Sequence, residues 1–125
     1  MEEVVVLDVR TSVLINNHGL LTYSNEITTD TLRRVRRKNI KEEIARIQAS
    51  PTHITIEDVV LYRNADVNYL FRTFFEHARK LGMLTVSIFV EAEYFNVVGY
   101  NFSYNSKVYL EEIGTWFLTK SLYME

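Results

Sequence analysis

The chain contains no cysteine, one proline and four glycines among its 125 residues. Without cysteine it has no disulfide, zinc–thiolate site or thiol nucleophile, which is typical of a reducing compartment. No run of about 20 apolar residues occurs, and the first residues are acidic, so we expect neither a membrane span nor a signal peptide. Repeats, linkers and low-complexity tracts are also missing. We therefore expect a cytoplasmic, intracellular protein with no membrane partner.

The composition favours one folded domain over residues 1–125. Hydrophobic residues make up 47% of the chain and aromatic residues 13%, which is enough for a sizeable core and too apolar for a disordered segment. His18, His53 and His77 are scattered along the sequence. Structural roles for them are more readily expected than roles as metal ligands.

Charge is distributed unevenly, although the net charge is only −2. Six of the 14 cations fall between residues 33 and 41, where no acid occurs, so the rest of the chain has eight cations against 16 acids. The six are Arg33, Arg34, Arg36, Arg37, Lys38 and Lys41. Two interpretations stay open: a solvated helix face, or a patch that contacts phosphates.

Short apolar runs predict five strands. We expect them at about 3–10, 12–16, 20–24, 52–57 and 84–90. Asn16, Asn17, His18 and Gly19 supply turn chemistry between the second and third strands, because Asn and Gly tolerate positive φ. The first three strands would then form a meander.

Periodicity and capping residues predict three helices. The first runs from about 30 to 48, with N-cap oxygens at 28–30 and Pro51 beyond its end. The second begins after Asn64 or Asp66, carries several aromatic residues and ends at Gly82. The sequence does not decide between helix and strand for residues 95–102. Residues 106–120 are expected to form the third helix, although Gly114 disfavours it by about 1 kcal/mol relative to Ala.

The resulting order is β-β-β-α-β-α-β-α, an α/β fold with a mixed sheet. Within it, Asp8 ends the first strand and Glu57 ends the fourth. Carboxylates are not expected on doubly buried strands unless they reach the sheet's edge and face a positive partner, and a divalent metal ion is one such partner. The structural alternative is that Glu57 caps the next turn and Asp8 pairs with Arg10.

The segment after the fourth strand resembles the RuvC-type Holliday junction resolvases. That family carries an Asp at the end of strand one and, after strand four, a Glu followed at fixed spacing by Asn-Ala-Asp. Here Glu57 is followed by Asn64-Ala65-Asp66, and Val97-Val98-Gly99 matches a later family motif. The resemblance implies an RNase H-like five-stranded sheet over residues 4–120, in which strands one and four are neighbours.

This resemblance implies a metal-dependent, structure-selective DNA endonuclease. Asp8 and Glu57 would be its catalytic residues and its ligands for Mg²⁺ or Mn²⁺, in a two-metal hydrolysis of phosphodiester bonds. A four-way DNA junction is the implied substrate, and its two-fold symmetry implies a homodimer. The expected DNA contacts are Tyr62, Arg63, Lys107, Arg33, Arg34, Arg37 and Lys41.

Several departures from the family keep alternatives open. Val9-Arg10-Thr11 stands where resolvases have a Pro-Gly turn, and the two acids of the family's last helix have no counterpart before Glu125. Glu91, Glu93, Glu111 and Glu112 remain as substitute ligands, and the alternative for each is a solvated surface acid. One alternative is a catalytically incomplete RNase H-like domain that binds branched DNA or a protein without cutting. Another is a small regulatory protein with no role at nucleic acids.

Aromatic residues of the second helix and of the loop before it also have two interpretations each. Tyr69, Phe71, Phe74 and Phe75 spread beyond one narrow stripe, as either a dimer interface or core. Tyr62 would either stack on an unpaired base or be a half-buried loop residue.

Overall fold

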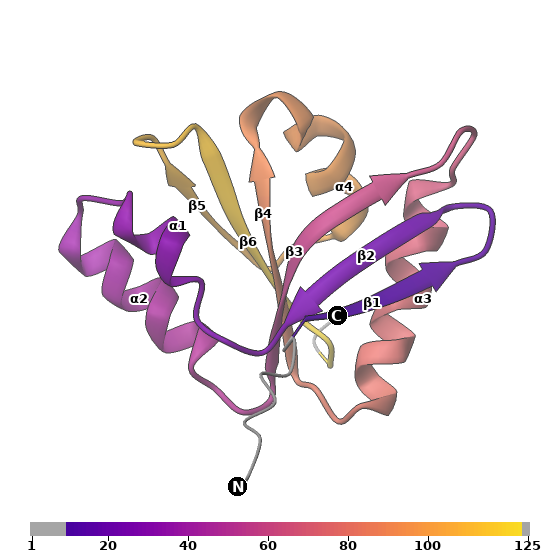
Figure 1. Cartoon of the computed structure of the whole chain (residues 1–125), viewed down its shortest axis with the longest axis horizontal. Coiled ribbons are helices and arrows are strands. Elements are labelled where there is room, and N and C mark those ends of the chain that lie inside the picture. Colours follow the sequence, from indigo (N-terminus) through magenta and orange to yellow (C-terminus); the bar gives the residue numbers. More distant parts are fainter. Residues whose placement is uncertain (1–9, 124–125) are drawn as a thin grey trace, which may run out of the picture.

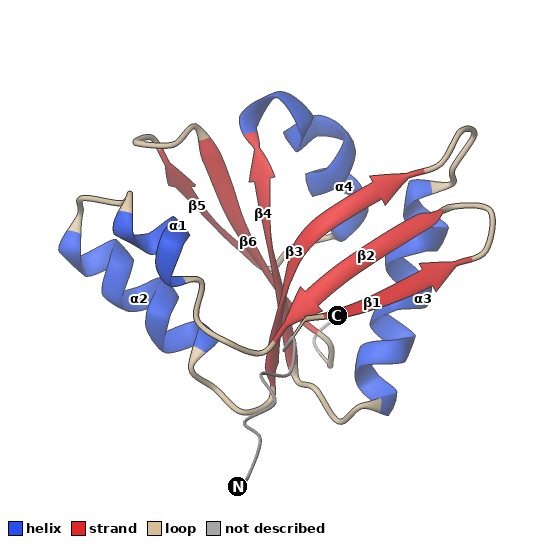
Figure 2. Cartoon of the chain, viewed as in Figure 1, coloured by secondary structure: helices blue, strands red, loops and turns tan. Residues whose placement is uncertain are grey.

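A mixed sheet of six strands lies between two layers of helices in the computed structural model, which describes residues 10–123 (Figures 1 and 2). The strand order is β1-β2-β3-β4-β6-β5, and within the described residues only β3 and β4 run parallel. The strands are β1 (Thr11–Ile15), β2 (Gly19–Ser24), β3 (His53–Leu61), β4 (Thr85–Glu91), β5 (Ser106–Leu110) and β6 (Thr115–Ser121).

The helices differ greatly in length. They are α1 (Thr29–Arg33), α2 (Lys38–Gln48), α3 (Val67–Lys80) and α4 (Tyr100–Phe102), with a 3₁₀ turn η1 (Ala92–Tyr94) and a π-helical turn η2 (Phe95–Gly99) before α4. None of the helices between residues 10 and 123 is long and apolar enough to cross a membrane.

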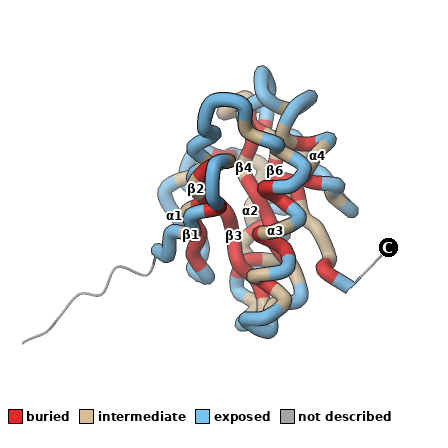
Figure 3. Tube along the Cα trace, turned by 90° about the vertical axis from the view of Figure 1, so that its right-hand side faces the viewer, coloured by how far each residue is buried: buried red, intermediate tan, exposed pale blue. Residues whose placement is uncertain are grey.

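Alternate residues of the central strands supply two separate cores. Val86, Ile88 and Val90 of β4 face the larger one, whereas Phe89 faces the smaller one on the opposite side of the sheet. In the same way, Leu118 of β6 packs in the larger core and its neighbour Phe117 in the smaller. Figure 3 shows the buried residues concentrated in the strands between the helices. Both faces of these strands are therefore covered.

Helix α3 covers the larger core and has well-defined ends. The side chain of Asp66 accepts a hydrogen bond from the backbone N–H of Tyr69 at 3.0 Å, which is an N-cap. At the other end, Gly82 has φ +83° and Met83 donates to the carbonyl of Ala78, as in a Schellman motif. The sequence predicted both ends correctly.

The aromatic residues of α3 belong to this core. Phe71, Phe74 and Phe75 are buried, and Phe71 packs edge-on against Phe102. Tyr69 is the exception at 43% exposure. The interpretation of this helix as a dimer interface is therefore not supported by its three phenylalanines, because they are inside the subunit.

Residues 106–120 do not form the predicted third helix. They contain β5 and β6, joined by a turn in which Gly114 has φ +59°. Because β6 is covered on both faces, its apolar residues do not alternate with polar ones, and such a run cannot be distinguished from a helix by periodicity.

The predicted helix over 30–48 is divided in two. Residues 34–37 interrupt it, since the backbone at Arg37 is extended with ψ 109° and the side chain of Arg37 contacts Glu112 in the β5–β6 turn. Leu32 and Val35, before the second helix begins, and Ile44 on α2 are all buried in the smaller core. The basic residues are divided between the two helices, with Arg33 in α1 and Lys41 in α2.

The sheet differs from the expected five-stranded arrangement. The described residues alone contribute six strands, and the predicted strand over 3–10 lies mostly outside them. Thr55 and Ile56 of β3 pair with β2 on one side and with β4 on the other. Within the described residues the neighbours of β3 are therefore β2 and β4, and the expected first strand is not among them.

Candidate functional site

Glu57 occupies a β-bulge where β3 changes its pairing with β2. Tyr23 pairs with Ile56, whereas the preceding Thr22 pairs with Asp58, so Glu57 has no partner across this strand pair. The pairing of β3 with β4 ends at Ile56, and the two strands diverge beyond it (Figure 1). Bulges re-aim side chains and are frequent next to active sites. Glu57 thus lies at the opening between two parallel strands.

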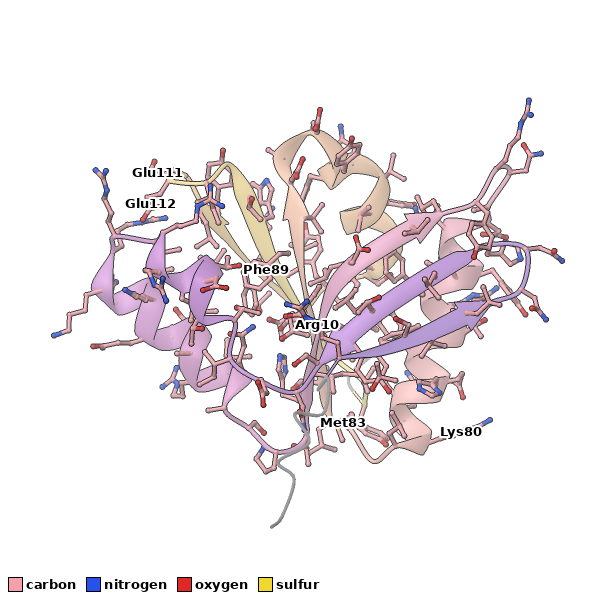
Figure 4. All side chains as sticks on the ribbon, in the orientation of Figure 1. Arg10, Lys80, Met83, Phe89, Glu111 and Glu112 are labelled. Carbon is pink, nitrogen blue, oxygen red and sulfur yellow. The ribbon has the colours of Figure 1, made fainter. Side chains whose placement is uncertain are left out.

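Three adjoining hollows surround this position, with volumes of about 390, 520 and 380 Å³. Glu57 and Phe89 line all three, and Figure 4 shows Phe89 near Arg10 at the centre of the molecule. The charged residues among their linings are Arg10, Arg34, Glu57, Asp58, Glu91 and Glu93. In α/β sheets, ligands bind outside the carboxyl ends of parallel strands, which is the location of these hollows.

The carboxylate of Glu57 forms an ion pair with Arg10. The distance from Arg10 Nε to Glu57 Oε2 is 2.8 Å, and the two side chains are 63% and 22% exposed. The same oxygen accepts no well-aligned hydrogen bond from any described residue. Water screens this partly exposed pair, which limits its contribution to about 0–1 kcal/mol. Glu57 does not cap a turn, because it lies within β3, and the predicted pairing of Asp8 with Arg10 lies outside the described residues.

The described residues do not by themselves fit a Mg²⁺ or Mn²⁺ site. Between residues 10 and 123, no three His, Asp or Glu side chains lie close enough together to hold a metal ion. Mg²⁺ requires near-octahedral oxygen coordination, and a single carboxylate next to a guanidinium supplies little of it. Asp8, the other predicted ligand and catalytic residue, lies outside the described residues.

Tyr62 and Arg63 lie farther from Glu57 than expected. Strand β3 continues to Leu61, so Tyr62 follows Glu57 by five positions of extended chain, roughly 16 Å at about 3.3 Å per residue. Tyr62 is 41% exposed, and its backbone N–H donates to the carbonyl of His18 at 2.9 Å. These two predicted DNA contacts therefore lie at the tip of β3 and not beside the carboxylate.

Lys107, another predicted DNA contact, is placed over aromatic rings. Its Nζ lies 5.6 Å from the ring centroids of Phe95 and Tyr104 and 5.3 Å from that of Trp116. These distances are within the range of cation–π attraction. Lys107 is exposed but does not line the hollows around Glu57.

The basic residues 33–41 have different environments. Arg33 is exposed and pairs weakly with Asp30 at 3.6 Å, and Arg34 is exposed and lines one hollow together with Glu57. Arg37 instead contacts Glu112 at 3.2 Å and donates to the carbonyl of Tyr109. Lys41 is partly buried on α2. At the break between α1 and α2, Arg34 therefore lies beside the hollow that Glu57 lines, whereas Arg37 has a structural role in attaching the break to β5 and the turn after it.

Glu112 holds this break in place. Its Oε2 accepts the backbone N–H of Arg36 at 2.7 Å and that of Arg37 at 3.4 Å. These hydrogen bonds, with that from the Arg37 side chain, lower the pKa of Glu112 to about 2. Glu112 is one of the acids expected as substitute metal ligands, but its carboxylate already accepts hydrogen bonds from the backbone at the N-terminal end of α2.

A buried polar chain near the amino ends of β3 and β4 was not predicted from the sequence. Gln48 accepts from the N–H and hydroxyl of Thr28 and donates to Thr55, whose hydroxyl contacts His53 Nε2 at 3.2 Å. On the other side, His53 Nδ1 lies 2.7 Å from the hydroxyl of Thr85. Burial lowers the pKa of His53 to about 4. The sequence does contain a signal for this chain, because His53 and Thr55 alternate with Ile54 and Ile56 and therefore point to the same face of the strand.

No family of known proteins, curated protein or solved structure matches the chain.

Proposed function

We propose that the protein binds DNA through the basic surface around the α1–α2 break and does not cut it with the residues described. The observation that carries this proposal is the position of Arg34 and Arg36. Both are exposed, on a backbone turn that Glu112 fixes through two hydrogen bonds. A fixed turn presents cations to phosphates with little loss of conformational entropy.

The charge on Glu57 also favours binding over catalysis. The guanidinium of Arg10 partly neutralises the carboxylate of Glu57. Although other acids line the same hollows, no three possible metal ligands cluster within residues 10–123. Branched DNA is the proposed target because of the resemblance to resolvases. The homodimer also stays a proposal, and sedimentation at several concentrations tests it.

The test measures binding of a labelled four-way junction and a labelled duplex by fluorescence anisotropy, without divalent metal and at increasing salt. Replacing Arg34 and Arg36 together by Gln should weaken binding to both. It should also reduce the slope of log K against log salt by about 2, since each phosphate contact contributes about 0.9.

A matched double variant, Arg46→Gln with Lys80→Gln, removes two other exposed cations and should leave the slope nearly unchanged. Absence of junction and duplex binding at about 50 mM salt, where phosphate contacts are strong, would contradict the proposal. An equal effect of both double variants would contradict the assignment to the α1–α2 break.

A second candidate is the metal-dependent endonuclease itself, favoured by the bulge that sets Glu57 at the opening between β3 and β4. Junctions incubated with Mg²⁺ or Mn²⁺ should then acquire symmetric nicks. Asp8→Asn and Glu57→Gln should abolish the nicks while the affinity for the junction is retained. Tight binding with no cleavage in either metal excludes this candidate.

A further inference from the structure

A separate hollow of about 510 Å³ lies on the opposite side of the sheet from α1 and α2. It is formed by α3, the residues around α4 and the end of β6. Its volume is in the range of small-molecule sites. The lining residues that matter most here are Tyr69, Arg72, Phe75, Glu76, Arg79 and Lys120.

Three cations and one acid line this hollow. Arg79 pairs with Glu76 at 2.5 Å and donates from Nε to the carbonyl of Leu122 at 3.0 Å. Arg72 is exposed and has no ion-pair partner among the described residues. Lys120 likewise has no carboxylate partner there. After the Arg79–Glu76 pair is discounted, two positive charges are left facing the same space.

Lys120 is held in position on the wall of the hollow. Its Nζ lies 5.4 Å from the centroid of the Phe75 ring and donates to the carbonyl of Ser103 at 3.4 Å. Burial and the nearby charge of Arg79 lower its pKa. An ammonium group has three N–H donors, and one neutral acceptor does not satisfy them. An anion in the hollow would supply the missing acceptors and offset the repulsion from Arg79.

We propose that this hollow binds the phosphate group of a small ligand, with Arg72 and Lys120 as the charged contacts. Asn68, Thr73 and Asn101 add polar side chains to the same lining. Tyr69 lines the hollow at 43% exposure, and its ring packs against that of His18 with 4.8 Å between the centroids. A nucleotide is the ligand class that would use both features, because its phosphate needs cations and its base needs a flat aromatic neighbour.

The experiment uses the whole chain and records amide chemical shifts by NMR during titration with inorganic phosphate, adenosine 5′-monophosphate and adenosine. Phosphate should shift the amides of Ser103 and Lys120. The monophosphate should shift them at lower concentration and also shift Tyr69, whereas adenosine alone should bind much more weakly. Equal affinity for phosphate and monophosphate would support a phosphate site and contradict the role of Tyr69.

Arg72→Gln should weaken binding of the monophosphate by about tenfold, as expected for the loss of one charge-assisted contact. Lys120→Gln should do the same, and its amide spectrum reports whether the fold is retained. Arg46→Gln, an exposed charge change on α2, is the matched control and should leave affinity unchanged. The proposal is overturned when none of the ligands shifts the lining amides, or when the control weakens binding as much as Arg72→Gln.

This outcome is independent of DNA binding. The variants at Arg34 and Arg36 lie on the other side of the sheet and should leave the titration unchanged. Either proposal can thus fail while the other holds.

Discussion

The imidazole of His53 is fully buried between the sheet and α2, where Thr55 and Thr85 contact its two nitrogens. Burial disfavours the charged ring, and its pKa falls from 6.5 to about 4. Hydrogen bonds to neutral hydroxyls do not compensate for the loss of solvation that a charged imidazolium would suffer. The residue is therefore a structural element of the fold that depends on being neutral.

A pH dependence of stability follows from that lowered pKa. Between pH 6.5 and 4 the unfolded chain binds a proton at His53 that the folded chain does not, so the free energy of unfolding should fall as the pH falls through this window. At about 1.36 kcal/mol per pKa unit, the loss approaches roughly 3 kcal/mol. Denaturant unfolding at several pH values measures it, and His53→Gln should flatten the curve.

NMR titration of the ring is the direct check. An imidazole resonance of His53 that titrates near pH 6.5 in the folded protein would contradict both the burial argument and the expected slope.

Individual residues were predicted with uneven success. The turn at 16–19 was expected from Asn and Gly, and it does form between β1 and β2. However, the positive φ belongs to Asn17, whereas Gly19 is needed because a Cβ there would lie 2.3 Å from the carbonyl oxygen of Val60. That contact joins residues 41 positions apart, so local sequence cannot indicate it. The same holds for Arg10, whose partner Glu57 lies two strands away.

At the scale of elements, the contact between the β5–β6 turn and α2 explains why the first helix is interrupted. The carboxylate of Glu112 accepts backbone N–H groups at the N-terminal end of α2, where a negative charge is favourable. Figure 4 shows Glu111 and Glu112 in this turn beside the helices. A helix prediction that uses only local periodicity has no access to an acid 75 residues away.

Glu112→Gln should loosen this attachment. Because the folded pKa of Glu112, about 2, is below its ordinary value of 4.5, its contribution is complete above pH 4.5 and is lost as the pH falls toward 2. The variant should have a lower thermal unfolding temperature at neutral pH and a weaker acid dependence in that window.

Glu111→Gln is the matched control for this measurement, because Glu111 is exposed in the same turn. It should unfold like the unmodified protein. An acid dependence that is equally reduced in both variants would contradict the role assigned to Glu112.

Elements with local signals were predicted well, and those with long-range determinants were not. Helix α3 has an N-cap at Asp66 and a glycine just after its C-cap, and both signals lie within its own sequence. The hairpin β5–β6 lacks such a signal, because its strand identity depends on pairing with β4 and on the helices that cover it. The bulge that exposes Glu57 depends on β2 in the same way.

At the scale of the molecule, residues 10–123 form two cores of unequal size, and the smaller one attaches α1 and α2. Ile44 is fully buried there among Leu110 and Phe117. Ile44→Ala should cost about 2–5 kcal/mol. Because this core is separate from the one beneath α3, we expect the loss to appear mainly as local opening of α1 and α2.

Native-state hydrogen exchange measures this. Amides of α2 should lose more protection than those of α3 and β4, and Ile47→Ala, a partly buried neighbour on the same helix, should have a smaller effect. Equal loss of protection in both layers would show that the two cores unfold as one unit.

The parallel pairing of β3 with β4 has a consequence for the order of folding. The β1–β2 and β5–β6 hairpins are closed by short turns, whereas His53 and Thr85 meet across 32 positions of chain. Such a closure has a higher entropic cost, and folding slows as contacts become less local. The opening beside Glu57 exists only after this pairing has formed. We therefore expect it to take shape late, after both hairpins are in place.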